Sequence, residues 1–226
     1  MLKVWGRPTS TNTQRVLWTL VEVELPYELI LASATTGEQG YVWQGQAPFG
    51  IVDTAAYRSM NPNGTIPTIS DGDFTLWESN AIVAYLARRH APAKLFGSDE
   101  QTFARALQWM SWANYRLDPP THALVMHLER LPADQRRAET VEDSRKDVIR
   151  ALELRLHQLE RSPYFAGAAF SIGDIPLAIS IQRFLHFRLE RPPMPRVESW
   201  LARLSEREGF RKHVAPRDKH VPGMGP

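Results

Sequence analysis

Three polar residues in a row near the N-terminus, Ser10, Thr11 and Asn12, are the first group that could do chemistry. They follow a short apolar segment and precede a helical pattern, so free backbone N–H groups and the positive helix dipole favour an anion there. A hydroxyl or amide directed at a bound sulfur would stabilise the thiolate. Lowering a thiol pKa from about 8.5 to about 6.5 needs roughly 2.7 kcal/mol, which one charge-assisted hydrogen bond plus the dipole can supply. The same residues also fit an ordinary helix N-cap, and spacing alone favours that interpretation.

The second group is Thr65-Ile66-Pro67-Thr68. A proline in a strand lacks a ladder donor and belongs at an edge or a bend. If the Ile66–Pro67 bond were cis, the backbone of Ile66 would face outward and could pair with an extended peptide ligand. X–Pro bonds in folded proteins are mostly trans, so these residues by themselves predict a trans bond.

The third group, Glu78-Ser79-Asn80, stands at the start of another helical pattern. A hydroxyl and free N–H groups at a helix start can bind a carboxylate, while Glu78 offers a partner for an ammonium. Together they suit the zwitterionic end of an amino acid. The alternative is again a helix cap, with Glu78 favourably placed in the helix dipole.

Composition limits what these groups can do. The chain has 226 residues, 43% hydrophobic and 23% charged, which is ordinary globular composition. It has no cysteine, so any sulfur chemistry needs a sulfur from a ligand. A net charge of +2 is too small to indicate nucleic acid binding. No apolar run reaches the ~18–20 residues of a membrane span, and the N-terminus lacks a signal-peptide core. We therefore expect a soluble cytoplasmic protein without nucleic acid or membrane partners.

The elements that position the three groups fall in residues 1–90. Alternation and turn residues predict strand, helix, strand, then a β-hairpin around Asp71-Gly72-Asp73 and a helix after Asn80. This βαβ-ββα order is typical of a small mixed sheet with helices packed against it. The fold class is α+β.

Residues 98–226 read as helices only, after a linker at 91–97. We expect a long helix after Asp99 that Pro119-Pro120 breaks or redirects, and a second long helix over 134–160. Ser171-Ile172-Gly173-Asp174 is a capping-box variant with Asp in place of Glu, before a helix over 175–189. A final helix contains Trp200.

Four motifs in order resemble the glutathione transferase superfamily over nearly the whole chain. They are Trp5-Gly6-Arg7 with Ser10-Thr11-Asn12 and Val16-Leu17-Trp18; Met60-Asn61-Pro62-Asn63-Gly64 with Ile66-Pro67; Trp77-Glu78-Ser79-Asn80-Ala81-Ile82 with Tyr85-Leu86; and Ser171-Ile172-Gly173-Asp174-Ile175. The resemblance implies a thioredoxin-like glutathione-binding domain at 1–90 and an all-α domain at 98–226 that completes the electrophile pocket. It also implies glutathione as cosubstrate, no tightly bound cofactor, and a homodimer.

The resemblance assigns residue roles as well. Thr11 matches the serine that activates the thiol in serine-type members, and Arg15 follows it by four residues as the basic residue does there. Asn12 matches an asparagine that has the same role in some bacterial members. Ser10 stays a third candidate. Ile66 would pair with the cysteinyl part of glutathione, which favours a cis Pro67. Glu78 and Ser79 would hold the γ-glutamyl head.

A second-substrate pocket is expected on the first long helix of the all-α domain. The candidates are Trp112, Tyr115, Arg116 and His122, while Trp109 is expected in the core. Aromatic rings would accept a flat apolar electrophile, and Arg116 would steer an anionic one. His122 and His127 lack the spacing and supporting carboxylates of a metal site, so no metal is expected.

Residues 32–59 depart from the family by their length. We interpret them as a lid over the glutathione site or the dimer cleft, or else as a surface excursion. Gln39, Gln44 and Gln46 are candidates for the glycyl carboxylate. The expected activity is attack of the glutathione thiolate on a hydrophobic electrophile; the alternatives are glutathione-dependent disulfide or peroxide reduction, and a non-catalytic interaction module.

Overall fold

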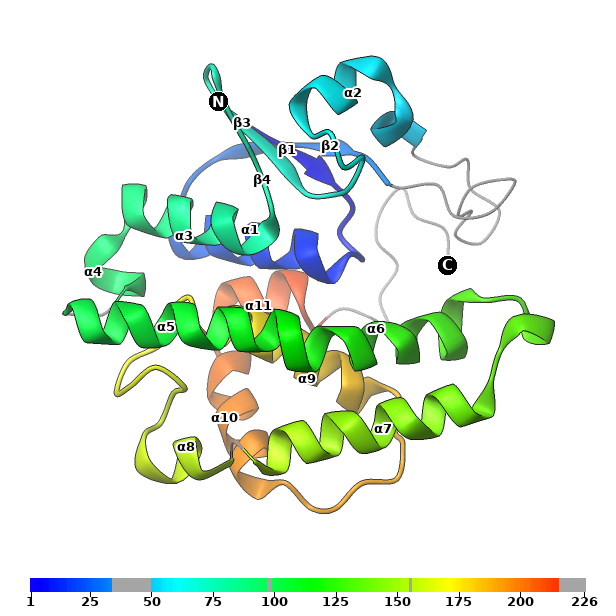
Figure 1. The fold of residues 1–226 in the computed structure, drawn as a ribbon. Coiled ribbons are helices and arrows are strands. Elements are labelled where there is room, and N and C mark those ends of the chain that lie inside the picture. The colour runs from blue at the N-terminus through cyan, green and yellow to red at the C-terminus, as the bar shows by residue number, and fades with distance from the viewer. Residues whose placement is uncertain (34–49, 97–98, 155, 216–226) are drawn as a thin grey trace. The chain divides into compact units, whose positions relative to one another are not determined.

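The computed structural model describes residues 1–33, 50–96, 99–154 and 156–215, which form two compact units (Figure 1). Of the described residues, those in Met1–His90 and those from Glu208 to Ala215 form the first unit, and those in Ala91–Arg207 form the second. Among the described helices, none is both long and apolar enough to cross a membrane.

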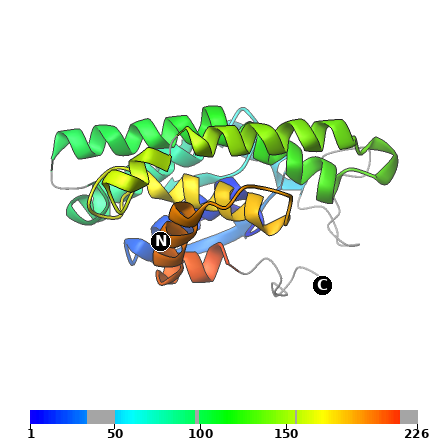
Figure 2. The same cartoon turned by 90° about the horizontal axis from the view of Figure 1, so that it is seen from below.

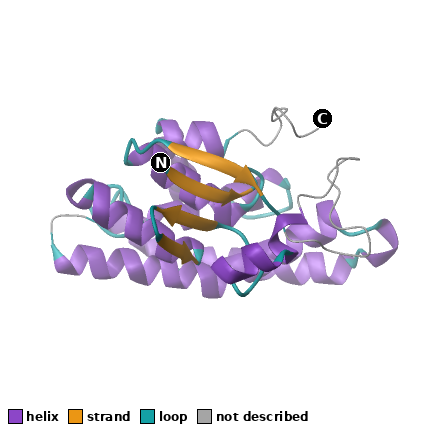
Figure 3. Ribbon diagram, turned by 90° about the horizontal axis from the view of Figure 1, so that it is seen from above, coloured by secondary structure: helices purple, strands orange, loops and turns teal. Residues whose placement is uncertain are grey.

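The first unit is built on a mixed four-stranded sheet with strand order β2-β1-β3-β4 (Figure 3). The strands are β1 (Leu2–Gly6), β2 (Tyr27–Leu31), β3 (Thr68–Asp71) and β4 (Phe74–Trp77). β1 pairs parallel with β2 and antiparallel with β3, which joins β4 in a hairpin. Gly72 has φ +62° in the hairpin turn, a conformation that glycine adopts at little cost. The predicted α+β class and its βαβ-ββα order are confirmed.

Helices cover both faces of this sheet. The helices of the first unit are α1 (Thr11–Glu22), the 3₁₀ turn η1 (Gly50–Asp53), α2 (Ala55–Met60), α3 (Ser79–His90) and α11 (Glu208–His213). α1 and α3 pack side by side on one face, where Val4, Leu17 and Ile82 belong to one buried cluster. On the other face a second cluster joins Ala32 to Tyr57 of α2. The end of the expected irregular loop at 32–59 is therefore helical, while residues 34–49 lie outside the described residues.

The second unit is helical, as predicted. Its elements are α4 (Pro92–Leu95), α5 (Glu100–Trp112), η2 (Ala113–Leu117), α6 (Asp118–Val125), η3 (Met126–Arg130), η4 (Ala133–Gln135), α7 (Ala138–Glu153), α8 (Leu156–Arg161), α9 (Asp174–His186) and α10 (Pro195–Ser205). α7 runs back along α6 (Figure 2), and α9 contacts α5, α6 and α10. Every residue from Asp174 to Ile181 of α9 is buried, so this helix forms the centre of the unit.

The break or redirection expected at Pro119-Pro120 is a change of helix type and not an end of the helical run. A wide π-helical turn, η2, follows α5 directly, and both prolines fall in the first turn of α6. In a regular α-helix a proline ring clashes with the carbonyl four residues earlier, and the wider turn of η2 gives both rings room.

The helix expected over 134–160 is two helices. α7 ends at Glu153 and α8 begins at Leu156, with Leu154 exposed between them. The apolar period continues through this point, and the sequence carries neither proline nor glycine there. α9 is also shorter than the helix expected over 175–189: it ends at His186.

The last helix belongs by its contacts to the first unit, whereas the sequence assigned every residue after 97 to the all-α domain. α11 packs on α1, where the rings of Phe210 and Trp18 meet edge to face at 5.5 Å between centroids. At Gly209 an added Cβ would overlap the indole of Trp18, so only glycine permits this close approach.

Candidate functional site

The β1–α1 junction is fixed by Ser10. Its backbone is extended, with φ −79° and ψ 125°, and its Oγ accepts the Thr13 N–H at 3.4 Å as the helix N-cap. The start of α1 lies close against β1 because Gly6 has no side chain; a Cβ there would lie 2.6 Å from Thr13 Oγ1. Of the three candidates for the thiol, Ser10 therefore serves the helix itself, as the cap interpretation predicts.

Thr11 and Asn12 follow this cap as the first two residues of α1. Thr11 is half-buried, and among the described residues its hydroxyl has no hydrogen-bond partner. Asn12 is exposed, and its Oδ1 accepts the Ser79 hydroxyl at 3.4 Å. The structure thus leaves Thr11 available to a ligand at the positive end of α1.

The start of α3 meets the start of α1. Ser79 is buried, and its Oγ accepts from Nη1 of Arg15 at 3.4 Å while donating to Asn12. The same Arg15 nitrogen donates to Asn80 Oδ1 at 3.3 Å. Arg15 is only 1% exposed, so its positive charge lies beneath both helix starts. The first and third polar groups of the sequence therefore form one network.

Glu78 precedes this helix in a left-handed conformation with φ 71°. Such a φ is unusual for a residue with a side chain and costs of order 1 kcal/mol or more. The Glu78 carbonyl accepts the Ile82 N–H at 2.9 Å, while its carboxylate is exposed and has no partner among the described residues. The turn thus holds an unpaired acid beside the buried Ser79.

The Ile66–Pro67 peptide bond is cis, and it lies immediately before β3. Within the described part of the chain, neither the N–H nor the C=O of Ile66 is hydrogen-bonded. Ile66 therefore has the free backbone donor and acceptor that the family resemblance requires for pairing with an extended ligand.

A buried polar cluster that the sequence analysis missed supports this loop. The Tyr57 hydroxyl donates to the Thr65 carbonyl at 2.6 Å and lies 2.8 Å from Thr68 Oγ1. Asn61, fully buried, donates from Nδ2 to the same two oxygens at 2.8 and 3.1 Å. Burial raises the pKa of Tyr57, so its phenol stays protonated and structural. The only sequence signal was the turn motif at 61–64, where the Asn61 Oδ1 accepts the Asn63 N–H at 3.1 Å.

The second-substrate candidates differ in their exposure and surroundings. Trp112 lines a cavity of about 250 Å³ together with Trp109 and His157, within the second unit. Tyr115, on the π-helical turn, is 85% exposed, and Arg116 beside it is also exposed. Trp109 is buried against Phe165, as predicted.

His122 is the fourth candidate and projects from α6. Partial burial lowers its pKa, helped by the positive charges of Arg130 and Arg183 and opposed by Asp118. Its imidazole is therefore neutral near pH 7. Among the described residues, no group of three or more His, Asp or Glu side chains could hold a metal ion. Gln39, Gln44 and Gln46 lie outside the described residues.

Two family models and several known proteins are similar to this chain. Residues 9–89 match the family model "Glutathione S-transferase, N-terminal domain", and residues 113–208 match "Glutathione S-transferase, C-terminal domain". Glutathione S-transferase GstB of Escherichia coli is 37% identical over 216 residues, 95% of this chain and 98% of that protein.

Solved structures give the same result. The theta class glutathione S-transferase of Xanthomonas axonopodis pv. citri, with glutathione bound, has a TM-score of 0.85 at 32% identity, over 96% of this chain and 99% of that one. A glutathione S-transferase of Pseudomonas fluorescens has a TM-score of 0.75 at 27% identity, over 92% and 96% of the two chains. The chain belongs to the glutathione S-transferase family, whose enzymes use glutathione as their cosubstrate.

Proposed function

We propose that this transferase binds glutathione along the starts of α1 and α3 and the Ile66–Pro67 loop, and that Thr11 activates its thiol for attack on a hydrophobic electrophile. Two observations at adjoining helix starts carry the proposal: the Thr11 hydroxyl has no hydrogen-bond partner among the described residues, and the Asn12–Ser79–Arg15 network lies at the same place.

The head of glutathione is proposed to lie at the start of α3. Its γ-glutamyl carboxylate accepts hydrogen bonds from the Ser79 hydroxyl and from the N–H groups of the first turn. Its ammonium pairs with Glu78, whose exposed carboxylate is free among the described residues. The hydrogen bonds of Ser79 at 3.4 Å are long, so a ligand carboxylate can replace them at little cost.

The cysteinyl part is proposed to pair with the free N–H and C=O of Ile66. This pairing directs the sulfur toward the start of α1, where Thr11 Oγ1 donates to the thiolate. A hydrogen bond to a charged group contributes about 1.5–3 kcal/mol, and the dipole of α1 about 0.3–1 kcal/mol. Their sum covers the roughly 2.7 kcal/mol that a thiol pKa near 6.5 requires.

The electrophile is proposed to be a small hydrophobic molecule. Tyr115 and Arg116, exposed on the π-helical turn, are our candidates for contacting it. Turnover of an aromatic halide compared with a disulfide distinguishes transfer to carbon from reduction of sulfur. We also propose a homodimer, which light scattering would detect as twice the chain mass of 25.8 kDa.

The test is the pH–rate profile of Thr11→Ala with glutathione and an aromatic halide. We expect the apparent thiol pKa to rise by about 1–2 units, because one charge-assisted hydrogen bond is lost. Thr11→Ser restores the profile. Ser10→Ala is the matched control, since it removes a cap worth about 1 kcal/mol of stability and leaves the profile in place.

Two results would count against the assignment. A Thr11→Ala profile identical to that of the wild type removes Thr11 from thiol activation; if Asn12→Ala then shifts the profile, the role passes to Asn12. Ser79→Ala should weaken glutathione binding measured by calorimetry while thermal unfolding changes little. Unchanged binding would mean that the head of glutathione lies elsewhere.

A further inference from the structure

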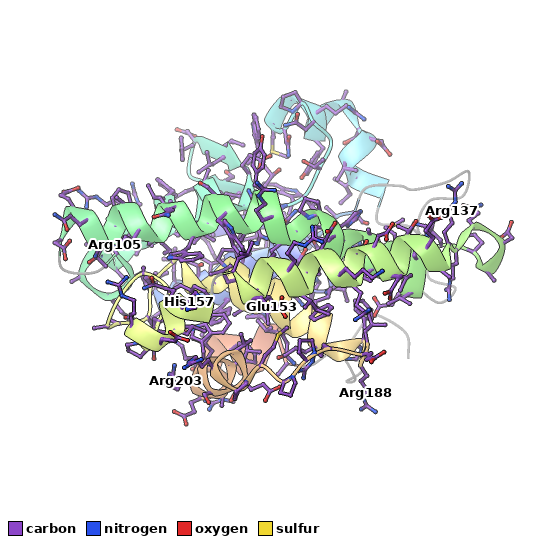
Figure 4. The ribbon with its side chains drawn as sticks, turned by 60° about the horizontal axis from the view of Figure 1, so that its bottom comes forward. Arg105, Arg137, Glu153, His157, Arg188 and Arg203 are labelled. Carbon is purple, nitrogen blue, oxygen red and sulfur yellow. The ribbon has the colours of Figure 1, made fainter. Side chains whose placement is uncertain are left out.

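A second cavity, of about 370 Å³, opens at the start of α7, at the end of this helix remote from His157 (Figure 4). Its walls come from η3, the first turns of α7 and the segment that follows α9. All of these belong to the second unit, and none of the residues proposed to bind glutathione lines the cavity. Its volume lies within the range of small-molecule sites.

Three arginines line this cavity, and they differ in what they bind. Arg136 donates from Nε to the Leu131 carbonyl at 2.8 Å, which holds the turn before α7. Arg145 donates to both oxygens of Glu142 at 2.8 and 2.7 Å. Arg137, beside the start of α7, has a guanidinium without a partner among the described residues. One cation at the cavity is therefore available to a ligand.

A second donor lies next to it. The backbone N–H of Arg137 donates to Nδ1 of His127 at 3.0 Å. Since Nδ1 is the acceptor, the neutral imidazole carries its proton on Nε2. His127 also lines the cavity, so its Nε2–H can donate to the same ligand as Arg137.

The charge along the α7 side of the cavity changes from one end to the other. Hydrogen bonds from Arg145 and Lys146 lower the pKa of Glu142 to about 2, so this carboxylate is always ionised near neutral pH. Glu142 offsets the charge of Arg145 and repels an anion from that end. Arg136 and Arg137 stand more than one helical turn earlier, at the positive end of the helix dipole. An anionic group is therefore favoured beside Arg137.

The rest of the lining is aliphatic. Leu128, Val141 and Leu189 supply its apolar surface, and the described lining residues include no Phe, Tyr or Trp. A bare inorganic anion would leave this surface in water, whereas an alkyl chain would cover it. The only ring among the described lining residues is the imidazole of His127, so a flat aromatic body gains little stacking surface.

We propose that this cavity is a binding site for a small aliphatic carboxylate, separate from the glutathione site. Arg137 and the Nε2–H of His127 hold the carboxylate, and Leu128, Val141 and Leu189 cover the alkyl chain. Arg136 keeps the turn in place and adds positive charge. The planar guanidinium matches the two oxygens of a carboxylate.

The test is calorimetric titration of the full chain with octanoate, with acetate and octanol as comparisons. We expect one octanoate per chain, and much weaker binding of acetate, which lacks the chain, and of octanol, which lacks the charge. Arg137→Gln should weaken octanoate binding about tenfold, as expected for the loss of one charge-assisted hydrogen bond. Arg150→Gln is the matched control, because Arg150 is exposed on the same helix and does not line the cavity.

A second variant tests the shape of the site without changing its charge. Ala138, exposed at the first position of α7, lines the cavity, and Ala138→Trp fills it. Octanoate binding should be lost in this variant. In the wild type, octanoate should bind equally well with and without saturating glutathione. The proposal is overturned if octanoate does not bind, if acetate binds as tightly as octanoate, or if glutathione displaces octanoate. It is also overturned if Arg137→Gln binds octanoate like the wild type, or if Arg150→Gln weakens binding as much as Arg137→Gln does.

Discussion

Replacing Asp174 by alanine removes a carboxylate that accepts four hydrogen bonds in the second unit. The carboxylate is fully buried at the start of α9. Oδ1 accepts from the Phe165 N–H and from Nε1 of Trp200, both at 3.0 Å, and Oδ2 accepts from the N–H of Ser171 at 3.0 Å and its hydroxyl at 3.2 Å. Burial raises the pKa of Asp174 to about 6, so the carboxylate is ionised at pH 7.

The size of the effect follows from which donors can find new partners. In Asp174→Ala the Ser171 hydroxyl rotates, but the N–H groups of Phe165 and Ser171 and the indole of Trp200 lose their acceptor. A buried donor left without a partner costs about 1–3 kcal/mol, and water that enters the small cavity recovers part of this. We therefore expect the free energy of unfolding to fall by about 3–5 kcal/mol.

Asp174→Asn is the informative comparison. Its carbonyl oxygen keeps Phe165 and Trp200, while its NH₂ group faces the Ser171 N–H, so one donor is left unsatisfied and the loss is about 1–3 kcal/mol. Asp143→Ala on the exposed face of α7 is the matched control and should stay within about 0.5 kcal/mol of the wild type.

Urea unfolding at pH 7, followed by far-UV circular dichroism, measures these differences. A loss below about 1 kcal/mol for Asp174→Ala would refute the reasoning, since it would mean that the donors are solvated or repaired without the carboxylate. Equal losses for the alanine and asparagine variants would refute the account of which donors remain paired.

Two further predictions concern the first unit. Gly209→Ala should lower the free energy of unfolding by about 1–3 kcal/mol, because the added methyl group forces Trp18 away from α11; differential scanning calorimetry measures it, and an unchanged Tm would contradict the packing argument. Burial, with Lys212, lowers the pKa of His213 to about 4, below its unfolded value near 6.5. The native state then binds fewer protons, so this stabilisation is complete above pH 6.5 and is lost as the pH falls toward 4. From pH 6.5 to pH 4, the free energy of unfolding of the wild type, measured with urea, should fall by about 2–3 kcal/mol more than that of His213→Gln. If the difference between the two proteins does not change with pH, the lowered pKa of His213 is contradicted.

The sequence predicted those features that depend on neighbouring residues. The capping box is an example: Asp174 accepts the Ser171 N–H at 3.0 Å, and the Ser171 Oγ accepts the Gly173 N–H at 3.2 Å. The β3–β4 hairpin and the cap by Ser10 are others. In each case residues two to four apart in the sequence form hydrogen bonds with backbone groups of the same segment. The local sequence pattern is therefore sufficient to predict these features.

The errors arose where distant residues decide the outcome. α11 packs on α1 through Gly209 and Trp18, which are far apart in sequence, and nothing near Gly209 indicates this. Pro119 and Pro120 would interrupt a regular α-helix, but the π-helical turn before them changes the hydrogen-bond pattern, so the helical run continues. The break after Glu153 falls where the apolar period runs on from Leu152 to Leu156, so the local pattern does not mark it.

The candidate site combines two kinds of polar contact, and their lengths differ for a physical reason. Beneath the Ile66–Pro67 loop, Tyr57 and Asn61 hold the two Thr65 and Thr68 oxygens at 2.6–3.1 Å and are inaccessible to a ligand. At the helix starts, the contacts of Ser79 are 3.4 Å long. Short buried bonds fix the backbone of Ile66, whereas long ones leave the capacity of Ser79 to donate largely unused. A glutathione site needs both, because a rigid loop reduces the entropy lost on binding, and donors that are not yet engaged keep their full strength for the ligand.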